Sequence, residues 1–248
     1  MPTSFNQLTL IACVTGAAQG IGLATAERLA RDGMQVLAMD FSAEKLHKSV
    51  QELQAKGLAV MAAEVDVCDR SSVLKALSIL PRIDVMVCAA GIYNDAALLD
   101  LTEEAFRRML EVNVIGTFIP AQEAARRMKP GGRIVTISSR GALGGTRFAH
   151  YVASKAAVIG LTRAMAMELR PLQIAVNSVA PGFTDTPMTR SAPKEMFEAW
   201  EELEPSGKAA TPDQIAQSIA FLASPETSFI TGQTLFVDGG KSLGGLSI

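Results

Sequence analysis

Residues 8–22 read LTLIACVTGAAQGIG, an apolar run that leads directly into a glycine-rich turn. A continuously apolar run of this length is typical of a strand buried on both faces of a parallel sheet. Glycines at 16, 20 and 22 allow a tight backbone turn, and the amides at the start of a following helix attract a diphosphate. The stretch therefore predicts a strand, a phosphate-binding turn and a helix, with a purely structural turn as the alternative.

Similar apolar runs alternate with helical patterns along the rest of the chain. We expect strands at 8–15, 35–40, 59–66, 85–89, 132–138, 173–179 and 234–237. The expected helices are at 20–32, 42–56, 71–80, 102–128, 151–169 and 212–223. This alternation predicts a single doubly wound, Rossmann-type α/β domain over residues 1–248, with a mostly parallel seven-stranded sheet and helices on both faces.

One segment interrupts the pattern. Residues 187–205 are polar and acidic and contain Trp200, the single tryptophan. The segment is either a short helical lid over a substrate site or a plain surface insertion.

Composition excludes several classes of function. The chain has 248 residues, 48% hydrophobic and 19% charged, with a net charge of −2. It has no basic block for nucleic acid or an anionic membrane, no apolar run of the ~20 residues that span a bilayer, and no secretory signal pattern in its first ten residues. Three unpaired cysteines suggest a reduced, cytoplasmic protein. With only His47 and His150 available, neither near a cysteine, we expect no metal site.

Tyr151 and Lys155 lie four residues apart in a predicted helix, so their side chains share one helix face. A nearby ammonium stabilises a phenolate and so lowers the tyrosine pKa from its reference value near ~10. A tyrosine tuned in this way can donate or accept a proton at neutral pH. Ser138 and Ser139 close an expected strand just upstream, within reach of the same carbonyl or alcohol.

The strand expected at 35–40 ends in Asp40, 18 residues beyond Gly22. A carboxylate at this point accepts hydrogen bonds from an adenosine ribose and repels a 2′-phosphate. Gln19, beside the central glycine, offers no cation to an extra phosphate. These residues predict NAD(H) as the cofactor in preference to NADP(H).

Two further strand ends fit a bound dinucleotide. Asp66, followed by Val67, ends the third expected strand, where its carboxylate can meet the adenine amine. The fourth expected strand runs into Ala89, Ala90 and Gly91, whose small side chains leave room for a flat ring.

Together these motifs resemble the short-chain dehydrogenase/reductase family over nearly the whole chain. The resemblance is carried by TGxxxGxG at 15–22, Asp66-Val67, Asn113, the serine pair, Tyr151-x-x-x-Lys155, Pro181-Gly182 with Thr184 and Thr186, and VDGG at 237–240.

The resemblance implies hydride transfer between a nicotinamide and a substrate carbon. Tyr151 would be the general acid in reduction and the base in oxidation, and Lys155 would lower its pKa and hold the nicotinamide ribose. Asn113 would hold a water that links Lys155 to solvent, or would simply kink its helix. The residues expected to bind the dinucleotide are Gly16, Gln19, Gly20, Ile21, Gly22, Asp40, Asp66, Val67, Ala90, Gly91, Tyr151, Lys155, Pro181, Gly182, Thr184 and Thr186.

The chain departs from the family pattern in two places. Cys88-Ala89-Ala90-Gly91 stands where the family often has Asn-Asn-Ala-Gly, so two bracing amides are missing. The polarising serine is also ambiguous: counting back 13 residues from Tyr151 gives Ser138, whereas aligning the strand end gives Ser139. We favour Ser139, because a strand cannot slip by one residue without turning every side chain to the opposite face.

For the substrate side we expect Tyr93, Arg140, Arg147 and Phe183 to contact the substrate with Ser139. One arginine among Arg140, Arg147 and Arg190 would bind a substrate carboxylate, with solvated surface charge as the alternative. We expect a small alcohol or ketone, apolar or aromatic, as the substrate.

The helix at 151–169 is apolar nearly all round, so a second copy should cover its outer face, and the resemblance implies a homotetramer, with a dimer as the next alternative. Residues 241–248 would dock across a subunit contact or fray.

Two other functions fit the sequence less well. An NADP(H)-dependent 3-oxoacyl-thioester reductase is disfavoured by Asp40 and Gln19. A non-catalytic dinucleotide-binding regulator would not need the tyrosine, lysine, serine and asparagine together.

Overall fold

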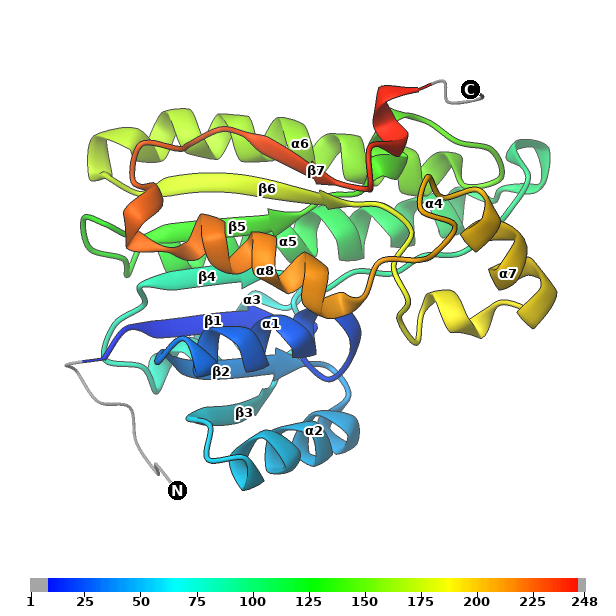
Figure 1. Ribbon diagram of the computed structural model, residues 1–248. Helices are drawn as coiled ribbons and strands as arrows, with labels where there is room; N and C mark the ends of the chain where they lie inside the picture. The colour runs from blue at the N-terminus through cyan, green and yellow to red at the C-terminus, as the bar shows by residue number, and fades with distance from the viewer. Residues whose placement is uncertain (1–8, 245–248) are drawn as a thin grey trace.

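The computed structural model describes residues 9–244 as one seven-stranded, all-parallel sheet between two layers of helices (Figure 1). The strand order is β3-β2-β1-β4-β5-β6-β7. The strands are β1 (Ile11–Thr15), β2 (Gln35–Asp40), β3 (Val60–Glu64), β4 (Val85–Cys88), β5 (Arg133–Ile137), β6 (Ala175–Pro181) and β7 (Thr234–Val237). The predicted fold class is confirmed. Residues 1–8 and 245–248 lie outside the described residues. They include the start of the strand expected at 8–15 and the end of the C-terminal segment expected to dock or fray.

The sheet is buried on both faces, as its apolar runs predict. In β1, Ala12 and Val14 point into one core cluster, and Ile11 and Cys13 point into the other. The first cluster is completed by α1 (Gly20–Arg31), α2 (Ala43–Ala55) and α8 (Pro212–Ala223). The second is completed by α3 (Arg70–Ser78), α5 (Gly116–Ala125) and α6 (Ala149–Leu169). Parallel strands end at a common edge, so the loops after β1, β2, β4, β5 and β6 gather there.

One predicted helix is divided in the structure. The segment expected as one helix at 102–128 forms α4 (Glu103–Leu110), a π-helical turn η2 (Glu111–Ile115) and α5. The break is centred on Asn113, whose carbonyl accepts a hydrogen bond from Thr117 Oγ1 (2.8 Å). The prediction of one continuous helix is therefore wrong, because a π-helical turn around Asn113 interrupts the α-helix.

The segment between β6 and α8 folds over the end of the sheet. It begins and returns at a bridge between Thr184 and Ala210 and contains the helix α7 (Lys194–Glu202). Phe183 packs against Phe197 and Trp200 of α7, with ring centroids 5.0 and 5.6 Å apart. Residues 187–205 thus contain a short helix, as the proposed helical lid requires.

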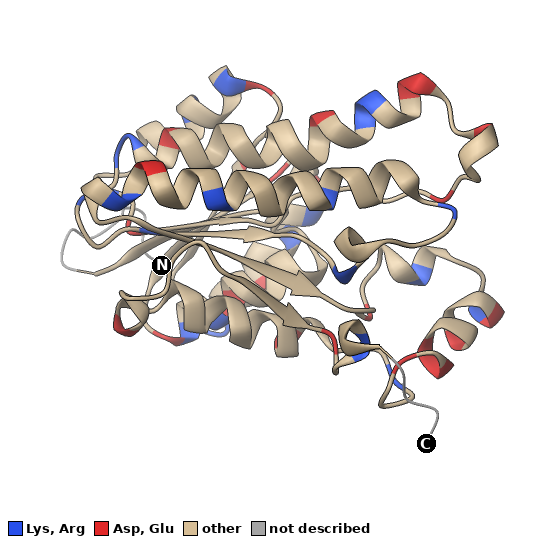
Figure 2. Cartoon of the chain, turned by 90° about the horizontal axis from the view of Figure 1, so that it is seen from above, with Lys and Arg blue, Asp and Glu red and all other residues tan. Residues whose placement is uncertain are grey.

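The remaining elements are short. The 3₁₀ turns are η1 (Leu98–Asp100), η3 (Arg140–Leu143), η4 (Arg170–Leu172), η5 (Thr189–Ser191), η6 (Pro225–Thr227) and η7 (Lys241–Leu243). Figure 2 shows Lys and Arg interspersed with Asp and Glu over the helices. Within residues 9–244, none of the helices combines the length and the apolar character needed to cross a bilayer.

Candidate active site

Tyr151 and Lys155 project from the first turns of α6 toward the end of β5. Lys155 is buried, and its Nζ donates a hydrogen bond to the carbonyl of Ile137 (2.9 Å). The same Nζ lies 5.7 Å from the centroid of the Tyr151 ring. Phenol and ammonium therefore share one small region, as their spacing predicts.

The two serines point in different directions. Ser139 Oγ accepts a hydrogen bond from Gly141 N (3.0 Å), and its hydroxyl also bonds to Tyr151. Ser138 is buried and donates to the carbonyl of Lys155 (2.8 Å). The geometry thus places Ser139 beside the phenol and leaves Ser138 in a structural contact.

The environment shifts the pKa of both α6 side chains. Burial raises the pKa of Tyr151, and the hydrogen bond with Ser139 opposes that rise. Burial lowers the pKa of Lys155 to about 8. The sequence predicted that Lys155 would lower the tyrosine pKa, and here that expectation is wrong in direction. The reason is that the phenol is enclosed, and its loss of solvent is the largest contribution to the shift of its pKa.

Asn113 connects η2 to the loop after β4. Its Oδ1 accepts from Ile92 N (2.8 Å), and its Nδ2 donates to Ile92 O (3.1 Å) and Ser154 Oγ (3.0 Å). A Cβ added to Gly91 would lie 3.1 Å from Asn113 Oδ1 and 3.4 Å from Lys155 Nζ. Asn113 and Lys155 therefore flank the same glycine.

The turn after β1 fits a dinucleotide diphosphate. A Cβ on Gly16, which has φ +66°, would lie 2.8 Å from Ala90 Cα, and one on Gly22 would lie 2.1 Å from the carbonyl oxygen of Gly16. Gln19 is the N-cap of α1 and makes no side-chain capping bond there. The first-turn amides of α1 are thus left to an anion, as this kind of site requires. Gly20 and Ile21 open the helix, and Ile21 packs against the core.

The carboxylate of Asp40 is fixed beside this turn. It accepts hydrogen bonds from Ala18 N (3.0 Å) and Ser42 N (2.9 Å). A carboxylate has about four acceptor positions, so capacity remains for two ribose hydroxyls. Asp66 accepts from Cys68 N (2.9 Å), two residues beyond the end of β3 rather than within it.

Val67 and the loop after β6 complete the predicted cofactor edge. Val67 is buried, and a Cβ on Gly116 would lie 2.7 Å from its Cγ2. Gly182, next to Pro181, has room for hydrogen alone, because a Cβ there would lie 2.8 Å from Asp238 Cα. Thr184 Oγ1 donates to the carbonyl of Gly182 (3.1 Å), and the methyl of Thr186 lies 3.4 Å from the Cβ position of Gly20. The β1 and β6 loops therefore approach each other at Gly20 and Thr186.

Thr15 is a site residue that sequence reasoning missed. Its Oγ1 accepts hydrogen bonds from Ala89 N (3.0 Å) and Ala90 N (3.1 Å). It thereby braces the β4 loop, where Cys88 and Ala89 lack the side-chain amides often found in the family. Two features of the sequence could have indicated this role. A threonine ends β1, and the loop after β4 begins with small side chains that cannot form hydrogen bonds to hold that loop.

The predicted substrate residues divide into two groups. Tyr93 packs edge-on against Tyr151, with ring centroids 5.1 Å apart, and so borders the candidate site. Phe183 belongs to the aromatic contact with α7 instead.

The three arginines also differ. Arg147 is paired with Asp95 (2.7 Å) and Arg190 with Asp185 (2.6 Å). Arg140 forms no ion pair with any residue in the described part of the chain. Of the three, Arg140 is therefore the one without a carboxylate partner among residues 9–244.

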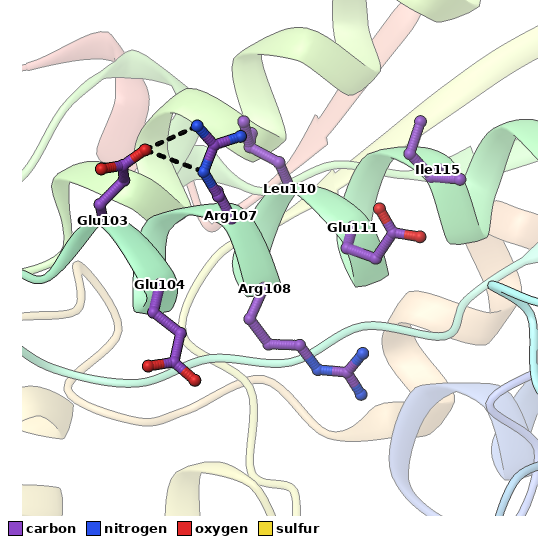
Figure 3. A pocket seen from close by; sticks show the side chains of 7 residues that line it. All are labelled: Glu103, Glu104, Arg107, Arg108, Leu110, Glu111 and Ile115. Carbon is purple, nitrogen blue, oxygen red and sulfur yellow. Dashed lines mark hydrogen bonds and ion pairs between the residues drawn. The ribbon is translucent and has the colours of Figure 1, made fainter.

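One surface hollow is lined by other residues than these. It measures about 880 Å³ and follows the exposed side of α4 and η2 (Figure 3). Its lining is mainly charged, including the Glu103–Arg107 pair (2.6 Å), and contains none of the predicted site residues. Residues 9–244 also hold no cluster of His, Cys, Asp and Glu suited to a metal ion.

Comparison with known proteins places this geometry in a family. The family model described as enoyl-(acyl carrier protein) reductase matches residues 16–242. The chain belongs to the short-chain dehydrogenase/reductase family. It is therefore an oxidoreductase of a family that binds nicotinamide dinucleotides.

Individual relatives of the family cover nearly the full chain. The chain is 39% identical over 239 residues to (2S)-[(R)-hydroxy(phenyl)methyl]succinyl-CoA dehydrogenase subunit BbsD of Thauera aromatica, covering 94% of this chain and 96% of the relative. It is 40% identical over 237 residues to the 3-oxoacyl-[acyl-carrier-protein] reductase FabG of Thermotoga maritima, covering 93% and 96%. A solved structure of a mutant actinorhodin polyketide ketoreductase with NADPH has a TM-score of 0.89 at 31% identity, covering 96% of this chain and 98% of that one.

Proposed function

We propose that the protein interconverts a secondary alcohol and a ketone by hydride transfer with NAD(H). When bound, the nicotinamide supplies the hydride acceptor or donor. Tyr151 donates the proton to the ketone oxygen in reduction and takes it back in oxidation. The hydroxyl of Ser139 binds the same oxygen, and Lys155 holds the ribose and stabilises the phenolate that forms.

The observation that carries this proposal is the convergence of four polar groups. Ser139 bonds to Tyr151, Lys155 lies over the Tyr151 ring, and Asn113 and Lys155 meet at Gly91. We propose that Asn113 orders a water through which Lys155 exchanges protons with solvent. A protein that only bound a dinucleotide would not require this arrangement.

The test is a substrate screen with a tyrosine variant. NADH oxidation is measured with acetophenone, 4-acetylbenzoate, ethyl benzoylacetate and acetoacetyl-CoA, and NAD reduction with the corresponding alcohols. Tyr151→Phe should lower turnover by about 10³-fold, because it removes the proton carrier, while NADH still binds. Unchanged turnover in Tyr151→Phe, with NADH binding intact, would remove the catalytic assignment.

Asp40 supports NAD(H) rather than NADP(H). A 2′-phosphate would lie against a carboxylate that two backbone amides already fix in place. Asp40→Ala should lower the ratio of kcat/KM for NADH over NADPH by about tenfold, since it removes like-charge repulsion. A wild-type enzyme with higher kcat/KM for NADPH would overturn the NAD(H) assignment.

A second candidate is an NADP(H)-dependent 3-oxoacyl-thioester reductase. The names of two relatives favour a thioester substrate, because one is a dehydrogenase of a hydroxyacyl-CoA and the other a reductase of a 3-oxoacyl carrier-protein conjugate. A similar solved structure contains NADPH, which favours NADP(H) as the cofactor. The acetoacetyl-CoA arm of the screen, run with both cofactors, separates the two candidates.

Arg140 bears on the substrate class. The matched pair acetophenone and 4-acetylbenzoate differs by one carboxylate. If Arg140 binds that carboxylate, Arg140→Met should lower kcat/KM for 4-acetylbenzoate by about tenfold and leave acetophenone unchanged. Equal wild-type activity on the two ketones would argue against a carboxylate site.

A further inference from the structure

The loop after β4 passes directly over the proposed proton donor. The Tyr93 ring packs at 86° to the Tyr151 ring, and Phe148 packs at 79° to it, with centroids 6.2 Å apart. Tyr93 and Phe148 are themselves 5.8 Å apart. Two rings from different segments thus border the phenol, so the position of the loop determines the shape of the space beside it.

The loop is held to neighbouring elements by contacts at both ends. At its start, both backbone groups of Ile92 bond to Asn113. At its end, Ala96 N donates to the carbonyl of Arg147 (2.7 Å), and Asp95 pairs with the Arg147 guanidinium. The ion pair is exposed, with 61% and 41% of the two side chains accessible, so it contributes little on its own.

The middle of the loop is held by a buried histidine. His150 precedes Tyr151 in α6, is fully buried, and contacts Asn94 Oδ1 through Nε2. Because Oδ1 is an acceptor, Nε2 carries the proton in this contact. Nδ1 is buried and finds no hydrogen-bond partner among residues 9–244. The bond to Asn94 is thus the one polar contact of the ring in the described structure.

We propose that His150 is a positioning residue whose imidazole fixes Asn94, and through it the Tyr93 ring, against Tyr151. A leucine would fill the same buried space without leaving a nitrogen unpaired, so packing alone does not explain an imidazole there. The role rests on the proposed function, because it matters for catalysis only if substrate binds beside Tyr151.

The test separates this role from general packing. His150→Leu removes the donor, His150→Gln keeps an N–H near the Nε2 position, and Asn94→Ala breaks the contact from the exposed side of the loop. His47→Gln, at the other histidine, which is exposed on α2, is the matched control. KM for acetoacetyl-CoA and ethyl benzoylacetate, KM for NADH, and amide hydrogen exchange of the peptide 92–97 are measured in each.

We expect His150→Leu and Asn94→Ala to raise KM for the ketone by about tenfold, because the Tyr93 ring beside Tyr151 is no longer held in position. KM for NADH should stay unchanged, because neither residue belongs to the proposed cofactor site. Exchange protection of 92–97 should fall in both variants. His150→Gln should stay within about twofold of wild type, as should His47→Gln.

Native KM and native protection in both disrupting variants would overturn the proposal, and so would equal losses in His150→Gln and His150→Leu. If His150→Leu does not fold, Asn94→Ala decides alone. Failure of the proposed function is recognised separately, by an active Tyr151→Phe. The exchange measurement then still tests whether the contact between His150 and Asn94 holds the loop in place.

Discussion

At the scale of single residues, the serine pair offers the sharpest test of the site. Ser139→Ala should lower turnover by at least about 10²-fold, because the hydroxyl that bonds to Tyr151 is lost at the reacting oxygen. Ser138→Ala removes a buried bond to the Lys155 carbonyl and should cost about 1 kcal/mol of unfolding free energy with little loss of turnover. Steady-state rates and urea unfolding of both variants check this. A larger loss of turnover in Ser138→Ala would reverse the assignment.

Lys155 gives the site a pH dependence. Burial lowers its pKa to about 8, so the ammonium is present below that pH and is lost as pH rises through it. Ketone reduction should therefore fall above pH about 8, since the neutral amine no longer stabilises the phenolate. In Lys155→Arg, whose guanidinium stays charged, the residual rate should show no fall at that pH. A wild-type profile that is flat from pH 7 to pH 9 would contradict this account.

Other residues show why the site could be predicted only in part. Tyr151, Lys155 and Asp40 lie where their spacing and strand ends place them, because helix periodicity and strand termini are local properties. The pairing of Arg147 with Asp95 joins residues 52 positions apart, which no local pattern reports. The pKa direction of Tyr151 was missed for the same reason, since burial depends on the loops that enclose the ring.

At the scale of elements, the C-terminal turn holds the end of the proposed lid. Lys241 in η7 pairs with Glu204 just beyond α7 (2.6 Å), and the Glu204 side chain is 6% exposed. Lys241→Met should lower the unfolding free energy by about 2 kcal/mol, because a buried carboxylate loses its partner. Fluorescence of Trp200, which lies in α7, reports the change during urea unfolding.

A matched control exists in the same segment. Lys208 is exposed and makes no ion pair with a described residue, so Lys208→Met should leave stability unchanged. The double variant Lys241→Met, Glu204→Met should recover much of the loss, because no unpaired charge remains. A double variant as unstable as Lys241→Met would show that the ion pair is not the cause.

The boundaries of the elements show which parts of the fold could be predicted from the sequence. β2, β7 and α8 match their predicted ranges, because apolar runs bounded by Asp40, Asp238 and the capping residue Thr211 mark them clearly. The interruption between α4 and α5 could not be placed from periodicity, since a π turn adds a residue without changing composition. The helix expected at 71–80 begins one residue earlier, because the side chain of Asp69 caps α3 by accepting from Ser71 N and Ser72 N. Ser42 makes no side-chain cap before α2.

At the scale of the whole molecule, α6 presents a mainly apolar outer face. Its exposed positions are Ala156, Ala157, Gly160, Ala164 and Met167, which is 72% exposed, together with the charged Arg163 and Glu168. Small side chains allow two helices to approach closely, and an exposed apolar face of this kind marks a contact surface. This supports the prediction that α6 packs against a second copy in a homotetramer.

The mass in solution decides that prediction. Light scattering should give roughly four times the 26.2 kDa of one chain. Ala157→Arg places a charge on the exposed face, where it fits a monomer but not a close helix pair, and should lower the mass while the far-UV spectrum stays native. Glu52→Arg, on the exposed side of α2, is the control and should leave the mass unchanged. A wild-type mass of 26.2 kDa would mean that α6 remains open to solvent, and its small residues would then need another explanation.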